Sequence, residues 1–128
     1  MDRKILLTAA ILGIIAIILG AFGAHALKQQ LDMQQLATFE TGVRYQMYHA
    51  LFLLFVALPN GISESGKKWI FYLVCIGVLF FSGSIYLLAT QTISGIKFNA
   101  IGIITPIGGL LLLAGWLVLV RELLRRKS

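Results

Sequence analysis

The chain has 128 residues, of which 59% are hydrophobic and only 12% are charged, and its mean hydropathy is +0.90. Soluble globular proteins usually contain about 25% charged residues, so the composition excludes an ordinary soluble domain. A formal net charge of +6 could indicate nucleic acid as a partner. We exclude that partner because the basic residues flank apolar blocks and form no patch interleaved with aromatic side chains.

The apolar residues fall into four continuous blocks. Each block is near the roughly 20 residues that a helix needs to cross about 30 Å of hydrocarbon. None alternates at every second residue, as the strands of a membrane β-barrel do. We therefore predict an all-α membrane protein, a four-transmembrane-helix bundle that forms one domain over residues 1–128. The expected spans are about 5–24, 39–58, 69–90 and 100–120.

Small residues recur along the first block at helical spacing. They are Ala9, Gly13, Ala16, Gly20 and Ala24. Such a stripe lets a neighbouring helix approach closely within a membrane. The basic start and the AHA sequence at 24–26 are also typical of a cleavable signal peptide, but a discarded leader has no need of the stripe. We expect helix contacts at Gly13, Gly20, Gly23, Gly108 and Gly109.

Residues 27–37, LKQQLDMQQLA, are polar with leucines near helical spacing, which predicts a short helix on the membrane surface. The second block, which follows, is unusual because its first half carries Glu40, Arg44, Gln46 and His49. Its second half is uniformly apolar and stops before the sequence PNG, whose residues typically end helices.

The basic residues predict the orientation. With four spans, both termini and the loop near residue 64 lie on one side of the membrane. That side carries eight of the eleven Lys and Arg residues: Arg3, Lys4, Lys67, Lys68, Arg121, Arg125, Arg126 and Lys127. The other side carries Lys28, Arg44 and Lys97. Because cytoplasmic loops are enriched in Lys and Arg, we predict that both termini are cytoplasmic.

The polar half of the second span is the candidate site. Glu40 and Arg44 are four residues apart with the acid first, which is the favourable order for an ion pair on a helix. A structural ion pair at the outer interface is the simpler interpretation, since an unpaired charge at the centre of a span costs about 2.5–3.5 kcal/mol. A ligand-binding site is the alternative, and it would include Tyr45, Tyr48 and His49.

The two histidines, His25 and His49, could hold a metal or haem only if their nitrogens converged. His49 lies roughly 8–15 Å deeper in the membrane than His25, and no second carboxylate or cysteine completes a site. We therefore predict neither a metal nor another cofactor. Instead, each histidine is expected to form a hydrogen bond to a neighbouring helix, with Tyr86, Thr90 or Thr105 as the partner.

Four segments resemble a known family. They are GAFGAHAL at 20–27, FETGVRYQMYHAL at 39–51, SGSIYLLA at 82–89 and TPIGG at 105–109. Over essentially its whole length the chain resembles the bacterial membrane family classed as domain of unknown function 423, which has small eukaryotic transmembrane relatives. The resemblance implies a four-span inner-membrane protein without an established activity. It also implies that His25, Glu40, Arg44 and His49 form a shared polar set.

Three functional hypotheses follow. The first is a non-enzymatic protein that binds a lipid or another hydrophobic ligand, or that is an accessory to a membrane partner; the absence of catalytic motifs favours it. The second is a small oligomeric transporter or channel in which Glu40, Arg44 and His49 form a relay. The third is a redox protein that uses His25 and His49. We expect membrane lipids as partners, with a second copy of the chain or another membrane protein as the alternatives.

Overall fold

The computed structural model of the chain describes residues 1–95 and 101–126. Within these ranges the structure is helical and contains no strand, so the all-α prediction is confirmed. The long helices are α1 (Asp2–His25), α2 (Met33–Ala57), α3 (Glu64–Ala89) and α5 (Ile101–Arg126). The short elements are the 3-10 turn η1 (Leu27–Gln29) and the single helical turn α4 (Gln91–Ser94).

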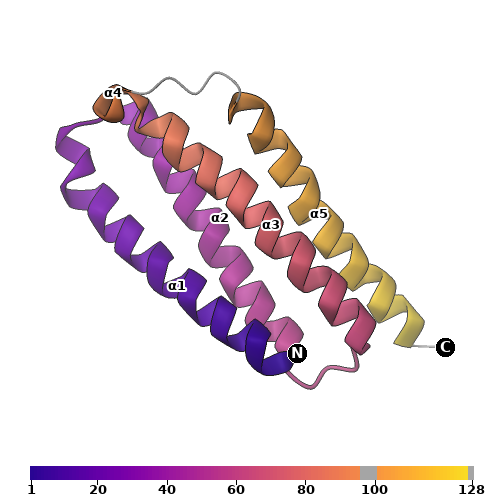
Figure 1. Cartoon of the computed structure of the whole chain (residues 1–128). Helices are drawn as coiled ribbons and strands as arrows, with labels where there is room; N and C mark the ends of the chain where they lie inside the picture. Colours follow the sequence, from indigo (N-terminus) through magenta and orange to yellow (C-terminus); the bar gives the residue numbers. More distant parts are fainter. Residues whose placement is uncertain (96–100, 127–128) are drawn as a thin grey trace.

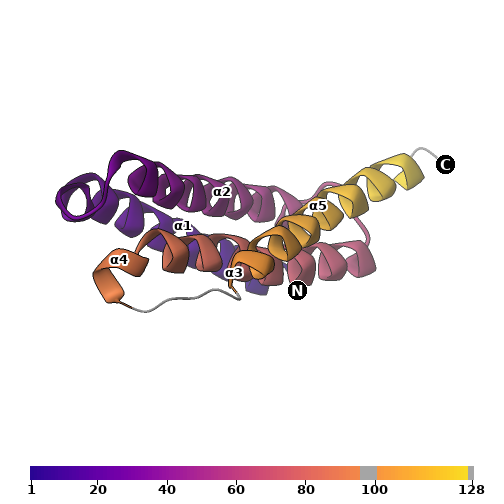
Figure 2. The same cartoon turned by 90° about the horizontal axis from the view of Figure 1, so that it is seen from above.

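The four long helices lie side by side in the order α1, α2, α3, α5 (Figure 1). Seen from above, α2 is displaced from α1 and α3, so the helices do not lie in one plane (Figure 2). Both termini and the α2–α3 connection lie at one end of the bundle, which we call the termini end. The opposite end, which holds η1 and α4, is the turn end.

Three helical segments of the described chain are long and apolar enough to cross a membrane. They are Asp2–Gln29, Glu64–Ala89 and Ile101–Arg125. Helix α2 is as long as the others, with 25 residues, but its polar first half keeps it out of this group. The fold is therefore that of a membrane protein, and by length and composition three of the four expected spans are candidate membrane spans.

Helix α2 begins at Met33 rather than near residue 39 because Asp32 caps it. The Asp32 side chain accepts a hydrogen bond from the Gln35 amide N at 2.7 Å, and the Gln35 side chain accepts one from the Asp32 amide N at 3.1 Å. This capping box satisfies two backbone donors at the start of the helix. The prediction of a separate surface helix over 27–37 is thus wrong: residues 27–29 form only the 3-10 turn, and residues from 33 onward belong to α2.

The last two long helices also exceed the predicted spans. Helix α3 begins at Glu64 because the Ser63 hydroxyl accepts a hydrogen bond from the Gly66 amide N at 3.0 Å. Helix α5 runs from Ile101 to Arg126, and residue 100 of the predicted span lies outside the described part of the chain. The polar and basic flanks are therefore helical as well, which hydropathy does not detect.

The small residues of α1 face α2, except for Gly13 and Ala24. Ala9 and Ala16 are each 1% exposed, and a Cβ added at Gly20 would contact the Val43 side chain at 3.5 Å. Gly23 is buried, whereas Ala24 is exposed. The packing role expected of Gly13 is not found, because a Cβ there would meet nothing within 4 Å.

Helices α3 and α5 approach each other closely at Gly108 and Gly77. A Cβ on Gly108 would overlap the backbone of Phe81, with the Phe81 Cα at 2.8 Å. Further along, a Cβ on Gly77 would lie 2.8 Å from the Leu112 side chain. The neighbouring Gly109 would make only ordinary contact with the Phe81 ring, at 3.6 Å. Of the two adjacent glycines, only Gly108 is required for the approach, because successive residues of a helix point about 100° apart.

Gly108→Ala should therefore destabilise the protein, by about 1–3 kcal/mol, since the added methyl group forces α3 and α5 apart. Gly109→Ala is the matched control and should leave stability unchanged or slightly raised, because alanine favours the helix. Thermal unfolding in detergent micelles measures both. Equal losses for the two variants would contradict the tight contact at Gly108.

Candidate functional site

Gln46 is a buried amide whose side chain bonds to two other helices. It is 3% exposed, its Nε2 donates to the Leu12 carbonyl of α1 at 2.8 Å, and its Oε1 accepts from the Tyr86 hydroxyl of α3 at 2.7 Å. A buried polar group has no water to bond with, so such an amide must find its partners within the protein. Gln46 thereby joins three helices.

Hydroxyl groups of α3 add two further links. The Ser82 hydroxyl donates to the Gly42 carbonyl of α2 at 2.7 Å, and the Ser84 and Thr105 hydroxyls share a short hydrogen bond between α3 and α5. Gly42 leaves room for the Tyr86 ring, which would lie 2.7 Å from a Cβ at that position. Every buried side-chain nitrogen and oxygen that the structure describes has a hydrogen-bond partner.

His49 is buried on the side of α2 that faces α5. Its Nδ1 lies 2.7 Å from the Tyr45 carbonyl oxygen, and its Nε2 accepts a hydrogen bond from Trp116 Nε1 at 3.1 Å. A carbonyl only accepts and an indole N–H only donates, so both contacts require the neutral ring with its proton on Nδ1. A second proton on Nε2 would face the Trp116 N–H. The ring is therefore fixed as a structural hydrogen-bonding group.

The expected histidine partners were wrong. Tyr86 bonds to Gln46, the Thr90 hydroxyl donates to the Tyr86 carbonyl of its own helix at 2.7 Å, and Thr105 pairs with Ser84. The actual partner of His49 is Trp116, whose ring also stacks on Phe52 at a centroid distance of 4.0 Å. A tryptophan within an apolar block needs a buried acceptor for its N–H. That requirement is the sequence feature that indicates a hydrogen bond between Trp116 and a polar residue of another helix.

Glu40 and Arg44 lie outside the packed interior, and no ion pair joins them, although the structure describes both side chains. Arg44 Nη2 instead donates to the Thr41 hydroxyl at 3.2 Å. Helical side chains point back toward the N-terminus, so Arg44 reaches Thr41 while Glu40 extends toward the turn end. The predicted structural ion pair is therefore wrong.

The remaining predicted site residues are dispersed. Tyr45 is 40% exposed and packs against Phe81 of α3, with ring centroids 5.0 Å apart. Tyr48 is exposed beside Tyr45, and His25 is exposed at the end of α1. Of the predicted set, His49 alone is buried between helices. The polar residues of α2 thus divide into an internal group, which holds helices together, and an external group at the turn end.

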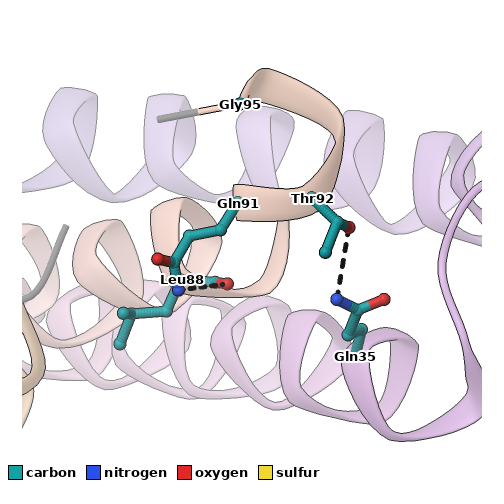
Figure 3. A pocket seen from close by; sticks show the side chains of 5 residues that line it. All are labelled: Gln35, Leu88, Gln91, Thr92 and Gly95. Carbon is teal, nitrogen blue, oxygen red and sulfur yellow. Dashed lines mark hydrogen bonds between the residues drawn. The ribbon is translucent and has the colours of Figure 1, made fainter. Parts of the chain in front are cut away.

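The turn end holds a small hollow of about 180 Å³ and two larger ones. The first of the larger two, of about 420 Å³, is lined by Gln35, Leu88, Gln91, Thr92 and Gly95 (Figure 3). Figure 3 shows Gln35 and Thr92 pointing toward each other, and Gln35 Nε2 donates to the Thr92 hydroxyl at 3.2 Å. Because the Gln35 amide also caps α2, both of its ends are occupied. This hollow is lined by neutral groups and joins α4 to α2.

The second hollow, which we call the turn-end groove, has a volume of about 470 Å³. It is lined by Lys28, Leu31, Met33, Leu36, Ala37 and Glu40. Its surface is apolar apart from one cation and one anion. Lys28 and Glu40 are both exposed and form no ion pair with each other or with any other described residue. The groove therefore combines two unpaired side-chain charges of opposite sign with an otherwise apolar lining.

These features define an all-helical membrane protein whose buried polar groups are paired between helices. The comparisons identify its family: the family model described as "Protein of unknown function (DUF423)" matches residues 19–109, and the chain belongs to that family. This membership confirms the resemblance drawn from the sequence motifs. No solved structure is significantly similar to the chain.

Close relatives cover nearly the whole chain. A UPF0382 membrane protein of Staphylococcus saprophyticus is 41% identical over 92% of this chain and 94% of its own length. A UPF0382 membrane protein of Haemophilus influenzae is 39% identical over 100% of this chain and 99% of its own length. The UPF0382 inner membrane protein YgdD of Escherichia coli is 37% identical over 98% of this chain and 93% of its own length. These names state a membrane location and no activity.

Trp116→Phe should destabilise the protein by about 1 kcal/mol, because the phenyl ring can still stack on Phe52 while the buried His49 Nε2 loses its donor. The exposed Trp69 provides the matched control, and Trp69→Phe should leave the unfolding temperature unchanged. Unfolding in detergent measures both variants. A Trp116→Phe protein as stable as wild type would show that the hydrogen bond to His49 contributes nothing.

Proposed function

We propose that this chain is a non-enzymatic inner-membrane protein that binds a phospholipid headgroup in the turn-end groove. The observation that carries the proposal is the pair of free, opposite charges, Lys28 and Glu40, in one apolar groove. A headgroup with a phosphate and an amine carries one negative and one positive charge, which are complementary to these two side chains. The cation suits the phosphate, and the carboxylate suits the amine.

The proposal requires α2 to be a fourth span. Its 25 residues extend about 37 Å at 1.5 Å per residue, which exceeds the hydrocarbon thickness of about 30 Å. Its internal polar side chains, Gln46 and His49, are hydrogen-bonded to other helices, which lowers the cost of burying them. With four spans, the basic residues of the termini end favour cytoplasmic termini, and the groove then faces the outer leaflet.

The outward face of α2 carries exposed apolar residues that an acyl chain could contact. Glu40, Arg44, Leu51 and Phe55 follow one another at helical spacing on that face. Leu51 is 56% exposed and Phe55 is 45% exposed, so the apolar part of the face is open to lipid. A lipid seated in the groove would lay its chain along these residues. Arg44, one turn from Glu40, adds a second cation for the phosphate.

The two alternative functions draw less support. A relay through Glu40, Arg44 and His49 would need these groups on one path, yet Glu40 and Arg44 are exposed while both nitrogens of His49 are engaged in the interior. A redox function would need His25 beside His49. His25 is exposed at the end of α1, whereas His49 lies beside Trp116 between α2 and α5.

Native mass spectrometry of the purified protein tests the lipid site. With phosphatidylethanolamine added, wild type should retain one lipid, and Lys28→Gln or Glu40→Gln should weaken retention about tenfold, since each removes one charged contact. Lys68→Gln and Glu64→Gln remove equal charges at the termini end and serve as matched controls. Lipid retention that is unchanged in the two groove variants would disprove the site.

Reporter fusions test the four spans. A reporter after Ser128 should be cytoplasmic, and one inserted within residues 28–36 should lie on the opposite side of the membrane. A further fusion near residue 62 should agree with the one after Ser128, because α2 then crosses the membrane. A reporter near residue 62 on the same side as residues 28–36 would show that α2 does not span.

A further inference from the structure

A separate groove lies at the termini end, between the start of α3 and the last turns of α5. Its volume is about 240 Å³. It is lined by Ser65, Gly66, Trp69, Val118, Arg121 and Glu122. Since the two grooves are at opposite ends of the bundle, this one shares no residue with the proposed headgroup site.

Three side chains that line this groove carry hydrogen-bond donors that have no acceptor within the described part of the protein. The Arg121 guanidinium, the Trp69 indole N–H and the Ser65 hydroxyl all belong to exposed side chains. None of the three forms a hydrogen bond to another residue in the described part of the chain. Arginine presents a planar set of donors that matches a phosphate, and an indole N–H can only donate. These three donors are therefore suited to the oxygen atoms of a phosphate group.

Glu122 also lines the groove, but its carboxylate is already engaged. Oε1 accepts hydrogen bonds from the Ser63 amide N at 2.9 Å and from the Ser63 hydroxyl at 2.8 Å. Oε2 lies 3.7 Å from Arg125 Nη1, and the side chain is 7% exposed. These contacts stabilise the charged carboxylate of Glu122. Arg121 attracts Glu122 electrostatically but forms no ion pair or hydrogen bond with it, so its guanidinium donors are available to a ligand.

The faces of α3 and α5 above the groove are apolar and exposed. Ile76 and Phe80 follow Trp69 at helical spacing on α3, and Ile107 lies on the matching face of α5. Trp69 itself is 62% exposed, which is typical of a tryptophan at the membrane interface. A ligand with a phosphate in the groove and a hydrocarbon tail along these residues would use both features.

We propose that this groove binds an anionic phospholipid, whose phosphate accepts hydrogen bonds from Arg121, Trp69 and Ser65. An anionic lipid fits better than a zwitterionic one because the groove offers donors and a cation, while its one carboxylate is engaged by Ser63 and Arg125. A free phosphate ion lacks the tail that the apolar faces would hold, so the lipid form should bind far more tightly.

The test uses the full chain in detergent and native mass spectrometry with dioleoyl-phosphatidylglycerol as the probe. Wild type should retain one phosphatidylglycerol about tenfold more tightly than phosphatidylcholine. Arg121→Gln should remove that preference, and Trp69→Phe, which keeps an aromatic ring but lacks the N–H, should reduce it. Inorganic phosphate at the same concentration should not displace the lipid.

Arg3→Gln is the matched control, since it removes an exposed arginine from the same end of the bundle but from α1. It should leave the preference intact, as should Lys28→Gln and Glu40→Gln, which report on the other groove. Equal loss in Arg121→Gln and Arg3→Gln would show diffuse charge attraction and overturn the proposal. So would equal retention of the two lipids by wild type. If Arg121→Gln fails to fold, retention in Trp69→Phe decides: an undiminished preference there overturns the proposal.

Discussion

The structure depends on the constraint that a polar side chain removed from water must find its partner within the protein. Gln46 meets that constraint by bonding to α1 through Leu12 and to α3 through Tyr86. Both bonds require α2 to turn this residue inward. The opposite face of α2, with Glu40 and Arg44, must then turn outward. One buried amide thus decides which polar residues hold the bundle together and which are available at its surface.

His49 applies the same constraint toward α5, where Trp116 donates to it. Together, Gln46 and His49 occupy the interior of the bundle with satisfied hydrogen bonds and leave its ends for ligand chemistry. The two proposed lipid sites follow that division. The turn-end groove offers charges of both signs, whereas the groove between α3 and α5 offers donors and one available cation.

Composition and block length predicted the all-helical membrane fold, because the cost of exposing polar backbone to hydrocarbon leaves few alternatives. The start of α2 was also visible in the sequence, as Asp32 followed three residues later by Gln35, yet hydropathy obscured it. The hydrogen-bond partners of the polar side chains were not predictable from the sequence. The rule for residues four apart indicated a Glu40–Arg44 pair, but Arg44 bonds to Thr41, and Trp116 reaches His49 only because α5 packs beside α2 and α3.

A double-mutant cycle at Gln46 and Tyr86 tests the central claim most directly. Gln46→Leu removes the amide at similar volume, and Tyr86→Phe removes only the hydroxyl. If the amide joins α2 to α3 through Tyr86, each change should lower the free energy of unfolding in detergent, and the double variant should lose at least about 0.5 kcal/mol less than the sum of the single losses. Losses that add to within about 0.3 kcal/mol would contradict the claim, because the two side chains would then act independently.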